Sequence, residues 1–256
     1  MTEIDKKIKK EEEQPPKHEL SGLLDTSYPL LQQFRETCPG SYKHAQALSS
    51  MLESVSVEIG LDVTFMKVVA FYHDIGKTLN PKYFTENQLK DENPHDKLDP
   101  WVSYQIISRH VSDSVNILVN NQDFPRRLIE IISQHHGNSV VKYFFDKSGS
   151  KDVDEYRYKG SRPMSVESAV LMIADHVEAT SRSLFQSGKL DQIDVIEETI
   201  NSLIDEGQLD EVLMRLGDLK KIKHALAKEL EGSYQKRVDY SKATEETETK
   251  DEKVKK

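Results

Sequence analysis

The sequence predicts an all-α protein of about seven to nine helices around one core. Apolar residues recur every three or four positions through almost all of residues 19–240, no stretch shows sustained alternation with a period of two, and no internal repeat is visible. Apolar residues make up 36% of the 256-residue chain, which is enough for one globular core, although length alone leaves two domains open.

The first two predicted helices have clear end signals. The first ends at Gly60, a residue type that is common just past a helix end. Asp62 is then expected to cap a second helix that runs into His73–Asp74. The buried face of the first helix is marked by apolar residues three or four positions apart: Ala45, Leu48, Leu52, Val55 and Ile59.

The middle of the chain contains one irregular stretch and two predicted helices. Gly76–Leu98 is the irregular stretch, and a loop of that length in a compact domain is more often functional than idle. Asp99–Pro100 pairs an acidic cap with a first-turn proline and predicts a helix through His110. Pro125 is expected to open a helix that continues to His135–His136 and closes at Gly137.

Three further helices are predicted after this point. Ser165 starts the first of them, and its apolar run is interrupted by Asp175. The second ends near Gly207, and the third follows Asp218. Both of the last two are amphipathic, because their apolar residues recur at helical spacing: Ile193, Ile196, Ile200 and Leu203 in one, and Leu219, Ile222, Leu226 and Leu230 in the other.

The two ends of the chain differ in composition from the middle. Residues 1–18 and 241–256 contain few apolar residues, and each carries five lysines and five acidic residues, so both are expected to be disordered tails of zero net charge. The formal net charge of −9 therefore belongs to the predicted domain, 19–240, and argues against binding of duplex nucleic acid. No apolar run is long enough to span a membrane, and a single cysteine, Cys38, suits a reducing, cytoplasmic location.

Seven residues form a candidate metal-binding set. A carboxylate at Asp175, among apolar neighbours, is costly to bury unless it is paired or bound to a metal. The doublets His73–Asp74 and His135–His136 each end an apolar helix just before a glycine, and this repetition is the main signal. The full set is His44, His73, Asp74, His110, His135, His136 and Asp175.

These seven residues favour two metal ions over one. Adjacent helical side chains diverge by about 100°. Two adjacent residues can therefore both bind metal most easily when they lie at a frayed helix end or when they bind two neighbouring ions. If Asp74 bridges through its two oxygens, the set supplies four bonds to each ion. Imidazoles and carboxylates without thiolates suit iron or manganese, permit zinc and disfavour calcium.

The sequence resembles the HD phosphohydrolase superfamily, which is named for a His-Asp pair such as His73–Asp74. The strings Tyr72-His73-Asp74-Ile75-Gly76-Lys77, Glu86-Asn87-Gln88, Asn93-Pro94-His95-Asp96-Lys97-Leu98, Gln134-His135-His136-Gly137, Tyr156-Arg157-Tyr158 and Ala174-Asp175-His176-Val177-Glu178-Ala179 are similar to the cytoplasmic HD domain of the seven-transmembrane HD family, the PgpH-type group. The resemblance covers about residues 30–240.

The resemblance implies a cyclic di-AMP phosphodiesterase. A metal-activated hydroxide would attack one phosphodiester and give linear pApA. One metal would be held by His44, His73, Asp74 and Asp175, and the other by Asp74, His110, His135 and His136. The base preference for adenine rests on the resemblance alone, and the sequence leaves the oligomeric state open.

Four further residues are weaker candidates for substrate contact. Lys77, three residues after Asp74, is placed to meet a phosphate or the leaving oxygen, with a solvated loop lysine as the alternative. Arg182 could do the same, although pairing with Glu178 explains it equally well. His95 and Lys97 in the irregular stretch could reach a nucleotide, with a loop-fixing hydrogen bond as the alternative for His95.

The sequence departs from the family pattern in two respects, and it leaves two alternative functions open. The membrane spans of the family are not present in this chain, and His176 stands after Asp175 where a small residue is expected. One rival is an HD phosphohydrolase of cyclic di-GMP, a nucleoside triphosphate or an alarmone, although the Gly-Tyr-Pro element typical of the cyclic di-GMP branch is missing. The other is a non-catalytic nucleotide-binding signalling module, which the full ligand set disfavours.

Removal of residues 1–18 and 241–256 is expected to leave phosphodiesterase turnover unchanged, because these segments lack the apolar residues needed to contribute to a core. The measurement compares the rate of pApA formation by the trimmed and full chains at equal metal content. A large loss of turnover in the trimmed chain would overturn the prediction that the tails are disordered.

Overall fold

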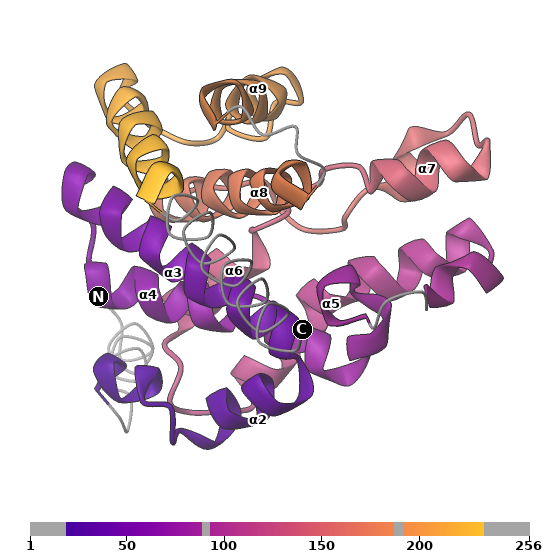
Figure 1. Cartoon of the computed structure of the whole chain (residues 1–256), viewed down its shortest axis with the longest axis horizontal. Helices are drawn as coiled ribbons and strands as arrows, with labels where there is room; N and C mark the ends of the chain where they lie inside the picture. Colours follow the sequence, from indigo (N-terminus) through magenta and orange to yellow (C-terminus); the bar gives the residue numbers. More distant parts are fainter. Residues whose placement is uncertain (1–18, 89–92, 187–191, 233–256) are drawn as a thin grey trace, which may run out of the picture.

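The computed structural model describes residues 19–88, 93–186 and 192–232, and every regular element in these ranges is helical (Figure 1). The predicted all-α class is confirmed. The expected disordered tails and residues 233–240 of the predicted domain lie outside the described residues. The α-helices are α2 (Pro29–Thr37), α3 (Pro39–Ile59), α4 (Val63–Tyr72), α5 (Pro100–Val119), α6 (Arg126–Ser133), α7 (Lys142–Ser148), α8 (Val166–Gln186), α9 (Gln192–Asp205) and a further helix over residues 216–232.

Short 3₁₀ helices connect these elements. Four of them fill the stretch that the sequence predicts to be irregular, between α4 and α5: η2 (Ile75–Leu79), η3 (Pro81–Tyr83), η4 (Thr85–Asn87) and η5 (Pro94–Lys97). Two others are η1 (Leu20–Leu24) and η6 (Val153–Tyr156), and an isolated antiparallel bridge joins Val140 to Arg157. The connection between α4 and α5 is therefore a series of tight turns within its described parts.

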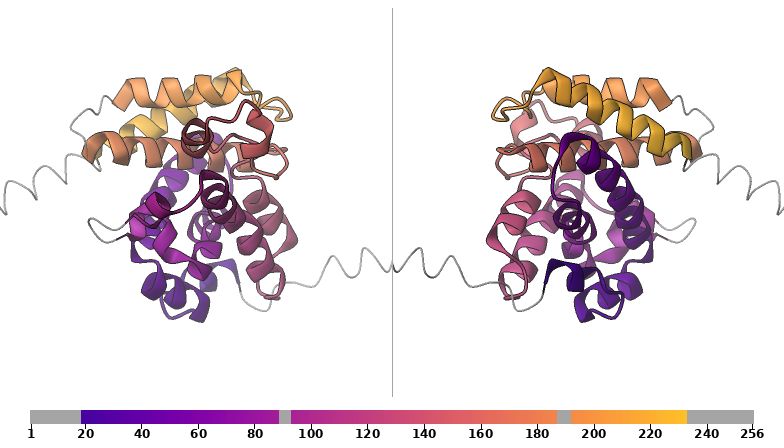
Figure 2. Two further views of the ribbon diagram at one scale, coloured as in Figure 1. Left: turned by 90° about the vertical axis from the view of Figure 1, so that its right-hand side faces the viewer. Right: turned by 90° about the vertical axis from the view of Figure 1, so that its left-hand side faces the viewer.

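The helices form two packed layers over one core. Figure 2 shows α8, α9 and the helix over residues 216–232 together on one side of the molecule, with the earlier helices on the other. Helix α3 packs against both α4 and α8, and α5 packs against η2 and α6. Side chains from both layers, among them Leu48, Val69, Leu171 and Ile200, are fully buried in the same cluster.

Several helix ends follow the predicted signals. The Asp62 carboxylate accepts a hydrogen bond from the Phe65 amide at 2.9 Å, and Asp99 accepts one from the Trp101 amide at 2.8 Å. Gly60 adopts a left-handed conformation, with φ of 81°, directly after α3. The end of α3 and the starts of α4 and α5 therefore follow from local sequence signals.

Two predicted helix ends differ from the structure. Helix α6 ends at Ser133, so the prediction that it continues through His135–His136 is wrong by three residues. A turn carries the doublet instead, in which the Gly137 amide donates a hydrogen bond to the Gln134 carbonyl at 2.9 Å. The last helix begins at residue 216 rather than after Asp218. Because His135 and His136 lie in a turn rather than in a helix, both side chains can face the interior of the fold.

Gly76 lies where η2 crosses α5, and a side chain cannot fit there. A Cβ atom at this position would lie 2.2 Å from the His110 carbonyl oxygen and 2.5 Å from the Ser114 amide nitrogen. The Ser114 hydroxyl accepts a hydrogen bond from the Gly76 amide and donates one to the His73 carbonyl, each at 2.9 Å. This close approach places the segment after α4 directly against α5.

Gly76→Ala is expected to destabilise the protein by about 1–3 kcal/mol, because the added methyl group forces η2 away from α5. Gly217→Ala is the matched control, since a Cβ at Gly217 meets no atom within 4 Å and alanine favours a helix. The measurement is the urea-unfolding midpoint of both variants and the parent chain. Equal midpoints for Gly76→Ala and the parent would contradict the close approach.

Candidate metal centre

Seven side chains from five segments of the chain meet in the interior of the fold. His44 comes from α3, the His73–Asp74 doublet lies between α4 and η2, and Asp175 comes from α8. His110 comes from α5, and His135–His136 come from the turn after α6. All seven are buried except His136, whose side chain is 18% exposed. The structure therefore brings together the whole set that the sequence singles out.

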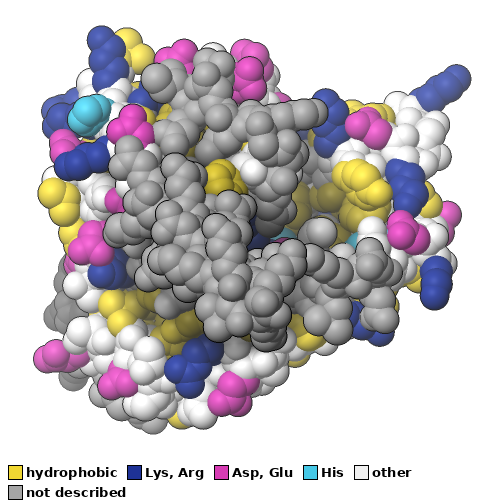
Figure 3. Space-filling model, in the orientation of Figure 1, with side chains coloured by type: hydrophobic (Ala, Val, Ile, Leu, Met, Phe, Trp, Pro, Cys, Tyr) yellow, Lys and Arg dark blue, Asp and Glu magenta, His cyan; other side chains and the backbone are white. Residues whose placement is uncertain are grey.

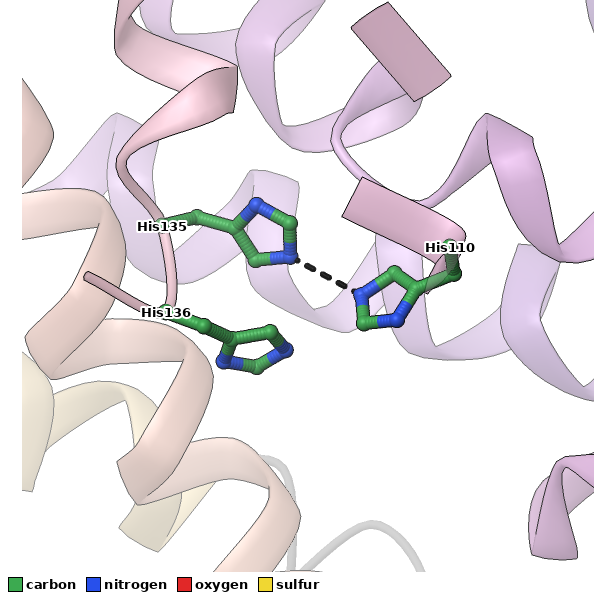
Figure 4. A group of neighbouring side chains, drawn as sticks. All are labelled: His110, His135 and His136. Atoms are coloured by element: carbon green, nitrogen blue, oxygen red, sulfur yellow. Dashed lines mark hydrogen bonds between the residues drawn. The ribbon is translucent and has the colours of Figure 1, made fainter. Parts of the chain in front are cut away.

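Six of these residues divide into two groups with metal-binding geometry. Group A is His44, His73 and Asp175, and group B is His110, His135 and His136. Within each group, one potential ligand atom from each residue lies within 4.8 Å of the others. Figure 4 shows that the three rings of group B converge on a common region from α5 and the turn after α6.

Asp74 lies between the two groups and faces each with a different oxygen. Its Oδ2 is 3.2 Å from His73 Nε2 of group A. Its Oδ1 is 3.3 Å from His110 Nε2 and 3.9 Å from His135 Nε2 of group B. A carboxylate in this position can ligate two ions at once.

Main-chain carbonyls fix the orientation of three histidine rings. The Nδ1 atoms of His73, His110 and His135 lie 2.8, 2.6 and 2.6 Å from the carbonyl oxygens of the residues three positions earlier, Ala70, Ile107 and Ile132. Because a carbonyl can only accept, each Nδ1 carries the hydrogen and donates it. In the neutral ring, Nε2 then presents a lone pair, which is the arrangement of a metal-binding histidine.

The inward-facing atoms lack partners that would satisfy them. His73 Nε2 and Asp74 Oδ1 are buried without a hydrogen-bond partner. His110 Nε2 and His135 Nε2 face each other at 3.1 Å, the contact dashed in Figure 4. A buried polar group without a partner is costly, and a cation between these atoms would satisfy them together. The residues present therefore fit divalent metal ions.

Protonation states in the centre also suit metal ligation. Burial, together with the neighbouring histidines, lowers the pKa of His135 to about 3 and that of His136 well below its usual range. Although burial opposes ionisation of Asp74, the nearby side chains of His73, Lys77 and His110 hold its pKa well below the usual range. His135 and His136 are therefore neutral imidazoles, and they lie beside the ionised carboxylate of Asp74.

His44 is held by two carboxylates. Its Nε2 lies 3.0 Å from Asp175 Oδ1, and its Nδ1 lies 2.5 Å from Glu178 Oε2. Burial alone lowers the pKa of His44, but the hydrogen bonds to Asp175 and Glu178 raise it to about 10. A metal ion at group A would displace the proton on Nε2, while Glu178 would keep the ring oriented through Nδ1.

Lys77 is tied to the centre rather than solvated. Its ammonium group lies 2.6 Å from Asp74 Oδ2 and 2.8 Å from Glu86 Oε1, and its side chain is 13% exposed. Although burial favours the neutral amine, both carboxylates raise the pKa of Lys77 above its usual range. Glu86 also accepts a hydrogen bond from the Ser41 hydroxyl at 2.8 Å, which links η4 to the start of α3.

A cavity of about 410 Å³ opens beside the centre. Lys77 and Arg182 line it together with Asp74, His136 and Asp175. Histidine side chains are visible within a hollow on the face shown in Figure 3. Ligand-sized cavities with convergent polar groups are typical of binding sites. The cavity gives a substrate access to both groups.

Two of the weaker candidates do not line this cavity. His95 is buried, and its Nε2 donates to the Tyr83 carbonyl at 2.8 Å, which ties η5 to η3. Lys97 is exposed at the end of η5. Arg182 does line the cavity, and its Nε lies 3.5 Å from Glu178 Oε2, the pairing that its position on α8 allows.

Three residues of the site have roles that the sequence does not reveal. Glu178 holds His44, Glu86 holds Lys77, and the Tyr158 ring stacks on His136 with ring centroids 4.4 Å apart. All three occur in the motif strings, and Glu178 lies one helical turn after Asp175. Their partners come from elements up to 134 residues away, so spacing along the chain gives no signal for the contacts.

Comparisons with known proteins find a family and curated relatives that are similar to this chain. The HD domain family matches residues 41–180. Two curated relatives are each named cyclic-di-AMP phosphodiesterase PgpH: one from Bacillus subtilis (strain 168), 34% identical over 229 residues, and one from Listeria monocytogenes serotype 1/2a (strain 10403S), 36% identical over 225 residues. These alignments cover 88% and 86% of this chain, which spans about a third of each relative, 32% and 31%.

Two solved structures share the fold. One is the HD domain of the L. monocytogenes phosphodiesterase PgpH, with a TM-score of 0.77 and 36% identity, and the other is that domain in complex with cyclic-di-AMP, with a TM-score of 0.76 and 35% identity. They cover 81% and 82% of this chain, and the whole of each solved chain is matched. No helix within the described residues is long and apolar enough to cross a membrane. The resemblance predicted from the motifs is confirmed, and the chain belongs to the HD-domain family.

Proposed function

We propose that this chain is a metal-dependent phosphodiesterase that hydrolyses cyclic di-AMP to linear pApA. The observation that carries the proposal is the position of Asp74, whose two oxygens face separate groups of ring nitrogens beside an open cavity. Two-metal centres of this type are common in enzymes that cleave phosphate esters. The names of the PgpH relatives support the choice of substrate.

The proposed centre takes two divalent ions. Group A with Asp74 would hold one ion, and group B with Asp74 would hold the other. The imidazole and carboxylate donors suit manganese or iron and also accept zinc. When bound, such ions lower the pKa of water and polarise phosphate oxygens.

The side chains around the cavity would position the phosphodiester. Lys77 uses two of its three N–H donors on Asp74 and Glu86, which leaves one for a phosphate oxygen or for the oxygen that leaves. Arg182 adds a second cation at the cavity wall, and its guanidinium has donors beyond the one directed at Glu178. Lys77 and Arg182 are thus the proposed substrate-binding residues.

The proposed reaction adds one water molecule to one of the two phosphodiester bonds. The P–O bond to one ribose breaks, the ribose oxygen takes a proton, and the other phosphodiester stays intact. The product is therefore linear pApA and not two mononucleotides. A reducing, cytosolic setting is part of the proposal, in keeping with the free and buried thiol of Cys38.

The test of the proposed function is a product analysis. The purified chain is incubated with Mn²⁺ and an equimolar mixture of cyclic di-AMP and cyclic di-GMP, with a chelator control, and products are separated by mass. We expect pApA to form in preference to the guanine product, in excess of the protein concentration, and to vanish with chelator and in Asp74→Ala.

Two outcomes would contradict the proposal. Preferential hydrolysis of cyclic di-GMP would assign the centre to another HD substrate. Stoichiometric binding of cyclic di-AMP without turnover, with metal verified as bound, would favour a signalling module that binds nucleotide without hydrolysis.

Metal content tests the bridging role of Asp74. Asp74→Ala is expected to lose both ions, because each depends on one of its oxygens, whereas His135→Ala is expected to retain at least one, because group A stays intact. The measurement is the metal content of each purified variant by elemental analysis, with circular dichroism as the control for folding. Equal metal content in both variants and the parent would refute the assignment.

A further inference from the structure

His176 belongs to a third group of potential metal ligands. It follows Asp175 on α8, and one ligand atom from each of His136, Asp175 and His176 lies within 4.8 Å of the others. This is the same distance criterion that groups A and B meet. We call His136, Asp175 and His176 group C.

Asp175 faces groups A and C with different oxygens. Its Oδ1 lies 3.0 Å from His44 Nε2 and 3.8 Å from His73 Nε2, both in group A. Its Oδ2 lies 4.0 Å from His136 Nδ1. The arrangement repeats that of Asp74, in which each oxygen of one buried carboxylate faces a different set of imidazoles. Oδ2 therefore remains available when Oδ1 ligates an ion at group A.

The two rings of group C also present suitable atoms. The Nδ1 of His176 donates to the Met172 carbonyl at 2.9 Å, so in the neutral ring Nε2 carries a lone pair. Figure 4 shows one ring nitrogen of His136 directed toward His110 and the other directed away. The rings of His136 and His176 lie edge to face, with centroids 5.8 Å apart.

From this geometry we infer that group C forms a third divalent-cation position, next to the proposed dinuclear centre and suited to zinc. Two imidazoles and one carboxylate oxygen, with water in the fourth place, form a common open zinc site. His136 and His176 are only partly buried, so solvent can reach the position. The inference rests on the proposed function, because the position shares Asp175 and His136 with the centre assigned there.

The ion at group C would bind with lower affinity than the ions at groups A and B. Ligation through both nitrogens of His136 requires loss of the ring proton, which group B alone does not require. Group C would therefore fill after groups A and B as free Zn²⁺ rises. An ion there also shares Asp175 and His136 with the other two ions and so weakens the bonds that these residues make to them. Its occupation is therefore expected to reduce phosphodiester hydrolysis at excess Zn²⁺.

The test is the zinc stoichiometry of the full chain without nucleotide. Metal-stripped protein is dialysed to equilibrium against a series of free Zn²⁺ concentrations, and bound zinc per chain is measured by elemental analysis. The parent chain is expected to bind a third equivalent that His176→Ala and His176→Gln lose. His224→Ala is the matched control, since His224 is an exposed histidine on the helix over residues 216–232 and belongs to none of the three groups.

The outcomes separate this inference from the proposed function. Two equivalents in the parent and in both His176 variants would overturn the third position and leave the dinuclear centre in place. Loss of the third equivalent in His224→Ala as well would also overturn it, because the binding would then be spread over surface histidines. One equivalent or none in the parent would overturn both the third position and the two-metal proposal.

Discussion

The buried carboxylate of Asp74 is the constraint on which the rest of the site depends. It lies between two sets of imidazoles and beside the Lys77 ammonium, in a region from which water is largely excluded. An ionised carboxylate is costly to bury unless compensating charges surround it. The Lys77 ammonium supplies one such charge, and the metal ions of the proposed centre would supply the rest. The side chains that would hold these ions come from α3, α5, α8, the end of α4 and the turn after α6, which all converge on this point.

The scaffold holds the ring nitrogens toward Asp74 by main-chain contacts. His73, His110 and His135 each donate a hydrogen bond from Nδ1 to the carbonyl three residues earlier. The helix or turn that carries each ring therefore also fixes the orientation of the ring. His44 differs, because the Glu178 carboxylate from α8, and not a main-chain carbonyl, orients its ring. The orientation of the His44 ring therefore depends on the packing of α3 against α8, while the orientations of the other three rings depend on the local backbone alone.

Sequence patterns predicted the helical class, and they singled out seven residues that the structure brings together. Both were readable because the signals lie within one or two helical turns of the chain. Helical spacing and caps such as Asp62 and Asp99 act within one turn, and the doublets stand out at helix ends. The pattern overextended α6 because apolar spacing does not show where a helix tightens into a turn. Glu178 could not be paired with His44 from the sequence, since that contact forms only when α3 packs against α8. Glu86 could not be paired with Lys77, since their contact depends on the path of the irregular turns between η2 and η4.

Anomalous diffraction from crystals loaded with two equivalents of Zn²⁺ tests the central claim most directly. The account predicts two peaks about 3.5–4 Å apart, each about 2.0–2.2 Å from a different oxygen of Asp74. One peak alone, or two peaks of which only one touches Asp74, would contradict the claim that this carboxylate joins the two groups.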